Sequence, residues 1–183
     1  MSEVLVYGAT GYTGQLIVEE AVAKGLRPIL SGRNAEALQV LATRYGLESR
    51  PASLDDAASL DAALRGVKVV LHCAGPFHRM APPMLAACLR NTVHYLDITG
   101  EIAVFERMAA SDAEAKRAGI TLLPGVGFDV VPSDCLAAHL KARMPEAVAL
   151  ELAFTGGTGL SRGTATTMVE GIAQGGAVRR GGK

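Results

Sequence analysis

Three glycines near the N-terminus, Gly8, Gly11 and Gly14, have the spacing of a turn that binds a dinucleotide pyrophosphate. They follow a short apolar run at residues 4–6 and precede an amphipathic stretch at residues 15–24. In such a turn the first glycine allows a tight reversal, the second lets the backbone approach the phosphates, and the third lets helix and strand pack closely. The pattern therefore predicts nucleotide binding, although glycines also punctuate ordinary turns.

The residues after the second expected strand distinguish NADP from NAD. Sites specific for NAD usually place an acid about 20 residues beyond the glycine turn, where it binds the ribose 2′-hydroxyl. This chain has Ser31, Gly32, Arg33 and Asn34 there, and none of them is acidic. The guanidinium of Arg33 can bind a 2′-phosphate through charge-assisted hydrogen bonds, or it can be a solvated loop charge. We expect the cofactor to be NADP.

The loop after the fourth expected strand should face the same ligand, because the carboxyl ends of parallel strands line the crevice of a doubly wound sheet. It contains Ala74, Gly75, Pro76 and Phe77. Gly75 permits close approach of a ribose or nicotinamide, and the next two residues can form a rigid wall beside the ring. The alternative is a simple turn. His78 follows, and we expect it to be a solvated loop histidine.

Three carboxylates follow the fifth and sixth expected strands and are the candidate catalytic groups: Asp97, Glu101 and Asp129. The first two can instead cap the next helix, and Asp129 can hold a turn. No histidine or cysteine has metal-ligand spacing, so we predict no metal site. No tyrosine is followed four residues later by lysine, which excludes the short-chain dehydrogenase mechanism. No phosphate-binding Gly-Lys-Ser/Thr sequence occurs either.

The composition is that of an ordinary folded domain. The 183 residues are 49% hydrophobic and 20% charged, with a formal net charge of zero and a pI near 6.9. This balance gives no electrostatic reason to expect nucleic acid or anionic lipid as a partner. No apolar run is long enough to span a bilayer, no signal peptide is apparent, and the three cysteines are scattered. We expect a cytoplasmic protein without an integral membrane segment.

Apolar runs and amphipathic stretches alternate along the chain, as expected for an α/β doubly wound parallel sheet, the Rossmann fold. We expect strands at 4–7, 28–31, 47–50, 68–72, 93–96 and 120–123, and helices at 12–24, 35–45, 57–64, 82–90 and 103–117. We assign residues 1–145 to this NAD(P)-binding domain. A strand at 147–154 and a helix at 164–173 then look like the truncated start of a second, α+β substrate domain at 146–183.

Six motifs in this order resemble the saccharopine dehydrogenase-like NADP-binding family, particularly the bacterial branch that includes trans-acting enoyl reductases. They lie at residues 8–14, 31–33, 74–77, 94–101, 125–134 and 161–165. The resemblance implies a set of cofactor-binding residues: Gly8, Thr10, Gly11, Tyr12, Thr13, Gly14, Ser31, Arg33, Ala74, Gly75, Pro76 and Phe77. Family members are typically about twice as long, so the chain looks like an N-terminal portion.

The resemblance implies an NADP-dependent oxidoreductase that transfers a hydride between nicotinamide and a C=N or C=C bond of an unknown small molecule. The cofactor would supply the hydride chemistry, and the protein would bind and orient it. The alternative is a non-catalytic NADP-binding sensor or interaction domain, because Rossmann folds are also reused for regulation. Apolar surface expected at residues 147–173 also predicts weak self-association, as a possible homo-oligomer.

Overall fold

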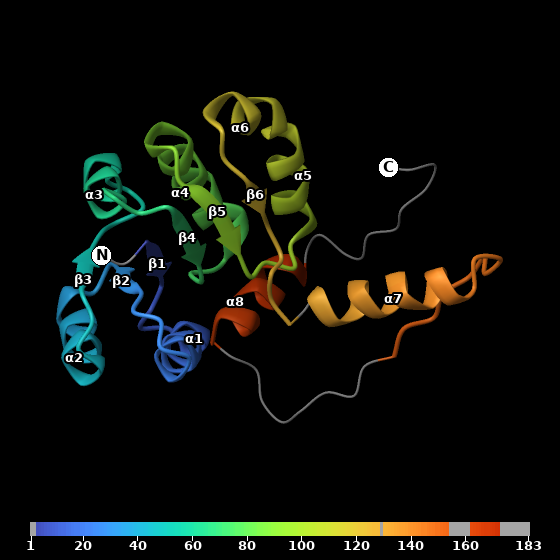
Figure 1. Ribbon diagram of the computed structural model, residues 1–183, viewed down its shortest axis with the longest axis horizontal. Helices are drawn as coiled ribbons and strands as arrows, with labels where there is room; N and C mark the ends of the chain where they lie inside the picture. Colours follow the sequence, from blue (N-terminus) through green and yellow to red (C-terminus); the bar gives the residue numbers. More distant parts are fainter. Residues whose placement is uncertain (1–2, 129, 154–161, 173–183) are drawn as a thin grey trace.

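The computed structural model describes residues 3–128, 130–153 and 162–172. In this part of the chain six parallel strands form one sheet in the order β3-β2-β1-β4-β5-β6 (Figure 1). The strands are β1 (Val4–Tyr7), β2 (Ile29–Gly32), β3 (Ser49–Pro51), β4 (Val69–His72), β5 (His94–Asp97) and β6 (Leu122–Leu123). The helices are α1 (Tyr12–Ala23), α2 (Ala35–Tyr45), α3 (Ala57–Ala63), α4 (Phe77–Asn91), α5 (Ile102–Ala110), α6 (Asp112–Ala118), α7 (Val131–Arg143) and α8 (Arg162–Gly171). The predicted α/β fold is confirmed.

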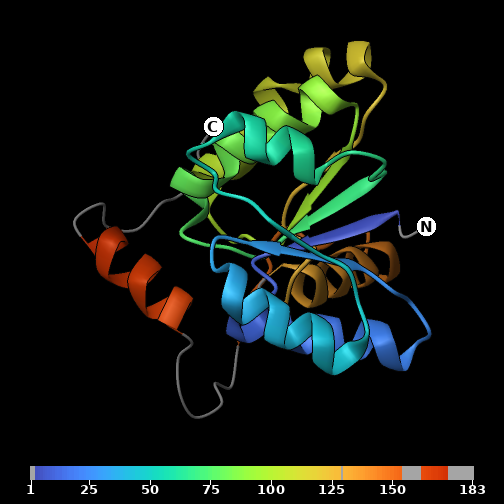
Figure 2. The ribbon, with the colours of Figure 1, turned by 90° about the vertical axis from the view of Figure 1, so that its left-hand side faces the viewer.

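Helices cover both faces of the sheet, because side chains alternate between the two faces along each strand. On β1, Leu5 and Tyr7 belong to the larger apolar cluster, which they share with α3, α4, α5 and α6. Val6 points to the other face, into a smaller cluster that contains Val18 of α1 and Leu38 of α2. Figure 2 shows α1 and α2 on one side of the sheet and α3 and α4 on the other.

The strand order places the ligand crevice. The chain runs from β1 outward to β3, then crosses back so that β4 pairs with the other edge of β1. Loops after β1 and β4 therefore diverge at the carboxyl ends of two adjacent strands, where open α/β sheets bind their ligands. The glycine turn follows β1 and residues 73–76 follow β4, so the fold brings these two predicted loops together.

Two of the helices expected before residue 120 depart from their expected ranges by more than one residue. Helix α4 begins at Phe77 rather than at Pro82, because the carboxylate of Glu101 accepts hydrogen bonds from the first backbone N–H groups of the helix. The helix expected at 103–117 is divided at Ser111 into α5 and α6. The Ser111 hydroxyl donates to the Arg107 carbonyl oxygen, 3.0 Å away, which closes the last turn of α5.

The segment after β6 is packed less closely than the rest. Helix α7 buries none of its residues, and α8 begins two residues before the expected helix. Residues 147–153 form no strand, so that part of the expected strand is wrong, and residue 154 lies outside the described residues. A strand needs a hydrogen-bonded neighbour, and these residues pair with none of the described strands. Val148 is fully exposed and Leu150 and Leu152 are about half exposed, so apolar surface does occur here, as expected. None of the described helices combines the length and apolar character that crossing a membrane requires.

Candidate functional site

The glycine turn after β1 is held by backbone hydrogen bonds to β2. The N–H groups of Gly8 and Ala9 both donate to the Ser31 carbonyl oxygen, at 2.8 and 3.2 Å, and Gly11 N–H donates to the Gly8 carbonyl oxygen at 3.0 Å. Gly8 has a φ of +82°, a left-handed conformation that glycine adopts without strain. The turn therefore opens directly into α1, whose N-cap is Gly11.

The three motif glycines have different surroundings. A Cβ atom on Gly14 would lie 2.2 Å from the Gly8 carbonyl oxygen, so helix and turn could not pack as they do. A Cβ on Gly8 would lie 3.0 Å from the Ala74 nitrogen of the β4 loop. A Cβ on Gly11 would meet only the Gly8 oxygen, at 3.3 Å, and would otherwise stand in the crevice. Gly8 and Gly14 are thus needed for packing, while Gly11 leaves room for a ligand, which is the division of roles that a pyrophosphate site requires.

A crevice of about 740 Å³ runs between the glycine turn, the β2 loop and the β4 loop. Nine of the predicted cofactor-binding residues line it: Gly8, Thr10, Gly11, Tyr12, Thr13, Arg33, Ala74, Gly75 and Pro76. Its remaining lining residues were not predicted: Tyr7, Gly32, Asn34, Leu54, Cys73, Arg79, Met80 and Thr166. None of the described lining residues is acidic. The crevice therefore suits a polyanionic ligand that binds to backbone N–H groups and guanidinium groups.

Three predicted cofactor-binding residues do not line this crevice. Gly14 packs against the glycine turn from within α1. Ser31 is fully buried, and its hydroxyl donates to the Arg50 carbonyl oxygen at 2.7 Å, so it joins β2 to β3 beneath the turn. Phe77 packs edge-on against the ring of His72, at 5.5 Å between centroids. These three support the walls of the crevice and do not form them.

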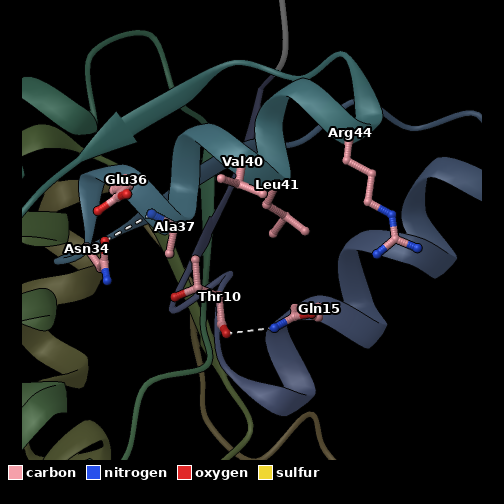
Figure 3. Close-up of a pocket in the computed structure, with 8 residues that line it drawn as sticks. All are labelled: Thr10, Gln15, Asn34, Glu36, Ala37, Val40, Leu41 and Arg44. Atoms are coloured by element: carbon pink, nitrogen blue, oxygen red, sulfur yellow. Dashed lines mark hydrogen bonds between the residues drawn. The ribbon is translucent and has the colours of Figure 1, made fainter.

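The β2 end of the crevice carries an exposed guanidinium group, that of Arg33. Arg33 is exposed and lines the crevice, and within the described part of the chain it makes no salt bridge or hydrogen bond. Its neighbour Asn34 caps α2, with its side-chain oxygen accepting from Ala37 N–H at 3.0 Å. Figure 3 shows a second hollow, of about 440 Å³ between α1 and α2, which shares Thr10 and Asn34 with the crevice. The guanidinium of Arg33 can therefore bind an anion beside the N-terminus of α2, which the Asn34 cap holds in place.

Asp97 is fully buried, and its carboxylate is used by three internal donors. One oxygen accepts from Thr99 N–H at 3.0 Å and from Gly125 N–H at 2.9 Å, and the other accepts from Tyr95 Oη at 2.6 Å. Burial, together with the nearby Asp97 carboxylate, raises the pKa of Tyr95 strongly. Asp97 does not line the crevice, and it does not cap the next helix, which was the alternative expected for it. Its carboxylate instead ties the β5 loop to the loop after β6.

Glu101 caps a helix other than the one that follows it. Its two carboxylate oxygens accept from Phe77 N–H at 2.8 Å and His78 N–H at 2.7 Å, at the start of α4. The second oxygen also lies 3.0 Å from His78 Nδ1. Glu101 is mostly buried, with 15% of its side chain exposed. From the sequence, Glu101 was a possible cap of the helix that follows it, whereas in the structure it caps α4. His78 was expected to be a solvated loop histidine, whereas its ring contacts this carboxylate.

Helix α8, although far along the chain, lies against the first turn of α4. Glu170 lies 2.6 Å from Arg79 Nη2 and 3.5 Å from His78 Nε2, while Thr166 lines the crevice one helical turn away.

Asp129, the third candidate carboxylate, lies outside the described residues. The described part of the chain holds no cluster of potential ligands for a metal ion.

His72, at the end of β4, is the most unusual buried polar group. It is fully buried, and among the described residues neither ring nitrogen makes a hydrogen bond of normal geometry. Burial lowers the pKa of His72 to about 3, and the Met80 backbone opposes the shift only weakly. The ring packs against Tyr7, Phe77 and Tyr95 at 5.4–6.2 Å between centroids. His72 is therefore a neutral packing residue beneath the crevice.

The fold and the crevice together define a dinucleotide-binding Rossmann domain. Residues 4–123 match the family described as the saccharopine dehydrogenase NADP binding domain, and the chain belongs to this family. It is 33% identical over 153 residues to the trans-acting enoyl reductase of Mycobacterium tuberculosis, covering 79% of this chain and 36% of that protein. It is 29% identical over 160 residues to the human saccharopine dehydrogenase-like oxidoreductase, covering 76% of this chain and 37% of that protein. The chain thus spans little more than a third of the length of these curated relatives.

A solved structure agrees with this assignment at the level of the fold. The apo saccharopine dehydrogenase (L-Glu forming) from Saccharomyces cerevisiae superposes with a TM-score of 0.68 at 21% identity. The match covers 80% of this chain and 32% of that one. The chain is therefore an NADP-binding domain of the saccharopine dehydrogenase-like oxidoreductases, as the sequence motifs predicted.

Proposed function

We propose that this chain binds NADP(H) in the crevice between the glycine turn and the β4 loop. The observation that carries the proposal is the open space beside Gly11, where only one backbone atom would meet a Cβ. The N–H groups at the start of α1 would hold the pyrophosphate, because a helix N-terminus favours an anion. Arg33 would hold the 2′-phosphate at the β2 end, where no acid would repel it.

We further propose that the protein to which this domain belongs is an NADP-dependent oxidoreductase acting on a C=N or C=C bond. The relatives with matching sequence carry the names oxidoreductase and enoyl reductase, and the latter acts on a C=C bond. When bound, the reduced nicotinamide would supply a hydride to an electron-poor carbon. The β4 loop, through Ala74, Gly75 and Pro76, would hold that end of the cofactor and exclude water from one side.

Calorimetric titration of the chain with NADPH and NADH tests the binding proposal directly. We expect tighter binding of NADPH, and equal affinities for the two cofactors would contradict the role of Arg33. Following NADPH absorbance in the presence of an activated alkene or a cyclic imine then tests the hydride-transfer proposal. A sensor or interaction domain would bind NADPH with the same preference but would oxidise none of it with any probe.

A further inference from the structure

The hydride-transfer function proposed above, on which this inference rests, needs a proton donor at the crevice. When a hydride adds to one atom of a double bond, the electron pair of that bond moves to the other atom. That atom must then take up a proton, and a positioned side chain usually supplies it. Neither Asp97, which is fully hydrogen-bonded internally, nor His72, which is buried and neutral, can do so.

The ionisable groups that line the crevice are also unsuited to this task. The Tyr7 hydroxyl donates to the Ala52 carbonyl oxygen at 3.1 Å, and burial raises its pKa. Burial likewise raises the pKa of the Cys73 thiol, to about 12. Arginine side chains keep their protons at neutral pH, which excludes Arg33 and Arg79. Tyr12 is the first residue of α1, at the end of the crevice where the phosphates would bind.

His78 remains: its side chain does not itself line the crevice, but the fold fixes its ring next to residues that do. It lies in the first turn of α4, between the crevice-lining residues Pro76 and Arg79. Glu101 holds both the backbone N–H of His78, at 2.7 Å, and its ring Nδ1, at 3.0 Å. A carboxylate can only accept, so Nδ1 carries a hydrogen, and a second proton on the ring must reside on Nε2. Nε2 is therefore the ring nitrogen that can gain or lose a proton while the contact with Glu101 is kept.

Nε2 faces α8, which forms part of the crevice wall. The nearest charged groups come from three elements: Glu101 before α5, Arg79 on α4 and Glu170 on α8. The distance of 3.5 Å from Nε2 to Glu170 is too long for a strong hydrogen bond, while the Arg79–Glu170 contact is short at 2.6 Å. Thr166, on the same side of α8 one turn earlier, lines the crevice. Nε2 therefore lies where α4 and α8 meet beside the ligand space.

We propose that His78 donates the proton that completes reduction of the substrate, and that Glu101 is its positioning residue. The hydride adds to one atom of the double bond, and the electron pair of that bond forms a new bond to the Nε2 proton at the other atom. The N–H bond breaks, the ring becomes neutral with its hydrogen on Nδ1, and solvent restores the second proton. Glu101 keeps its charge throughout and stabilises the protonated ring before transfer.

Chemical modification tests the position of His78 without any substrate. Diethyl pyrocarbonate modifies a neutral imidazole at its unprotonated nitrogen, and mass spectrometry locates the product. We expect saturating NADP⁺ to slow modification of His78 several-fold and to leave His139, which is exposed on α7, unchanged. Equal rates with and without NADP⁺, in a protein that binds NADP⁺, would place His78 away from the nicotinamide and overturn the proposal.

Nitrogen-15 NMR of the imidazole rings tests the role of Glu101. Neutral His78 should carry its hydrogen on Nδ1, although free histidine prefers Nε2. In Glu101→Gln an amide N–H would face Nδ1, so we expect that preference to be lost. Glu106→Gln, the same change at an exposed site on α5, is the matched control and should have no effect. An Nε2–H tautomer in the unmodified protein would contradict the positioning role.

Turnover then separates this inference from the function on which it rests. Turnover is measured in the protein to which this domain belongs. With trans-2-hexenal or 1-pyrroline as probe, His78→Gln in that protein should lower kcat about 10²- to 10⁴-fold, as loss of a general acid does. Its Kd for NADPH should stay within twofold of the unmodified protein, and His139→Gln should retain full turnover. Turnover that persists in His78→Gln overturns the inference alone. An unmodified protein that binds NADPH and reduces neither probe contradicts the hydride-transfer function.

Discussion

The two halves of the crevice are built on different principles. The phosphate half, from the glycine turn to Arg33, is formed by backbone groups within about one βαβ unit, with Ser31 and Asn34 as local supports. The β4–β5 half depends on side chains from α4, the β5 loop and α8, and its longest-range hydrogen bond joins residues 91 positions apart, Arg79 and Glu170. Local backbone geometry is sufficient to form the half that carries the glycine turn, whereas the β4–β5 half requires long-range tertiary contacts.

The largest effect is expected within the phosphate half, where folding and binding can be separated. A Cβ at Gly14 would overlap the Gly8 oxygen, so Gly14→Ala should destabilise the fold by about 3 kcal/mol or more. Gly11→Val should keep the native circular dichroism spectrum and lose detectable binding of NADPH, because its side chain would fill the pyrophosphate space. Chemical denaturation and calorimetry check the two variants side by side. If Gly11→Val binds NADPH unchanged, the glycine motif forms only a structural turn and does not bind the pyrophosphate.

The β4–β5 half should depend comparably on Asp97. Asp97→Ala leaves three buried donors without their acceptor, each costing about 1–3 kcal/mol, so we expect the free energy of unfolding to fall by about 3 kcal/mol or more. Urea denaturation measures this change. Asp55→Ala, at an exposed position with no salt bridge in the described residues, is the control and should change stability little. A small loss in Asp97→Ala would show that this half is held by other contacts.

Arg33 tests whether the phosphate half distinguishes cofactors. A charge-assisted hydrogen bond contributes about 1.5–3 kcal/mol, so Arg33→Ala should weaken NADPH binding roughly tenfold to a hundredfold. Binding of NADH should hardly change, because NADH has no 2′-phosphate. Arg44→Ala, on the neighbouring helix α2, serves as a matched loss of charge. Equal losses for both cofactors would contradict the specificity assigned to Arg33.

The effect that is smallest at neutral pH is a pH dependence that arises beneath the β4 loop. Folding lowers the pKa of His72 from about 6.5 in the unfolded chain to about 3, so the unfolded state binds the extra proton between these values. Its contribution to stability is therefore complete above pH 6.5 and is lost as the pH falls towards 3, by at most about 1.4 kcal/mol per pH unit. Denaturation of His72→Leu at several pH values should show a shallower decline. A parallel decline in both proteins would contradict this assignment.

The phosphate half was predicted from sequence because its determinants are local. A strand, three spaced glycines and a helix specify the turn within eleven residues, and Arg33 follows at the expected distance. The succession of strands and helices along the chain could be predicted for the same reason, because apolar runs alternate with amphipathic stretches. Ser31 and Phe77 lie beside the predicted loops, in β2 and at the start of α4, but motif position alone cannot tell a lining side chain from one that supports the wall.

The other half could not be predicted because its contacts join residues that the sequence separates. Nothing near Phe77 indicates that its N–H group is capped by Glu101, 24 residues later, and the two prolines inside α4 favoured a later start. The i, i+3 and i+4 spacing of Pro76, Arg79 and Met80 would have indicated a helical crevice wall once that start was known.

The Glu101 cap has a consequence for the motions of the loop it holds. The first backbone N–H groups of a helix normally lack a partner and exchange their hydrogen with solvent quickly. Here Phe77 and His78 are bonded to a carboxylate from another loop, so these two amides can exchange only when the two loops separate. Their hydrogen–deuterium exchange rates therefore report how often the β4–β5 half of the crevice opens, independently of any ligand or catalytic assay.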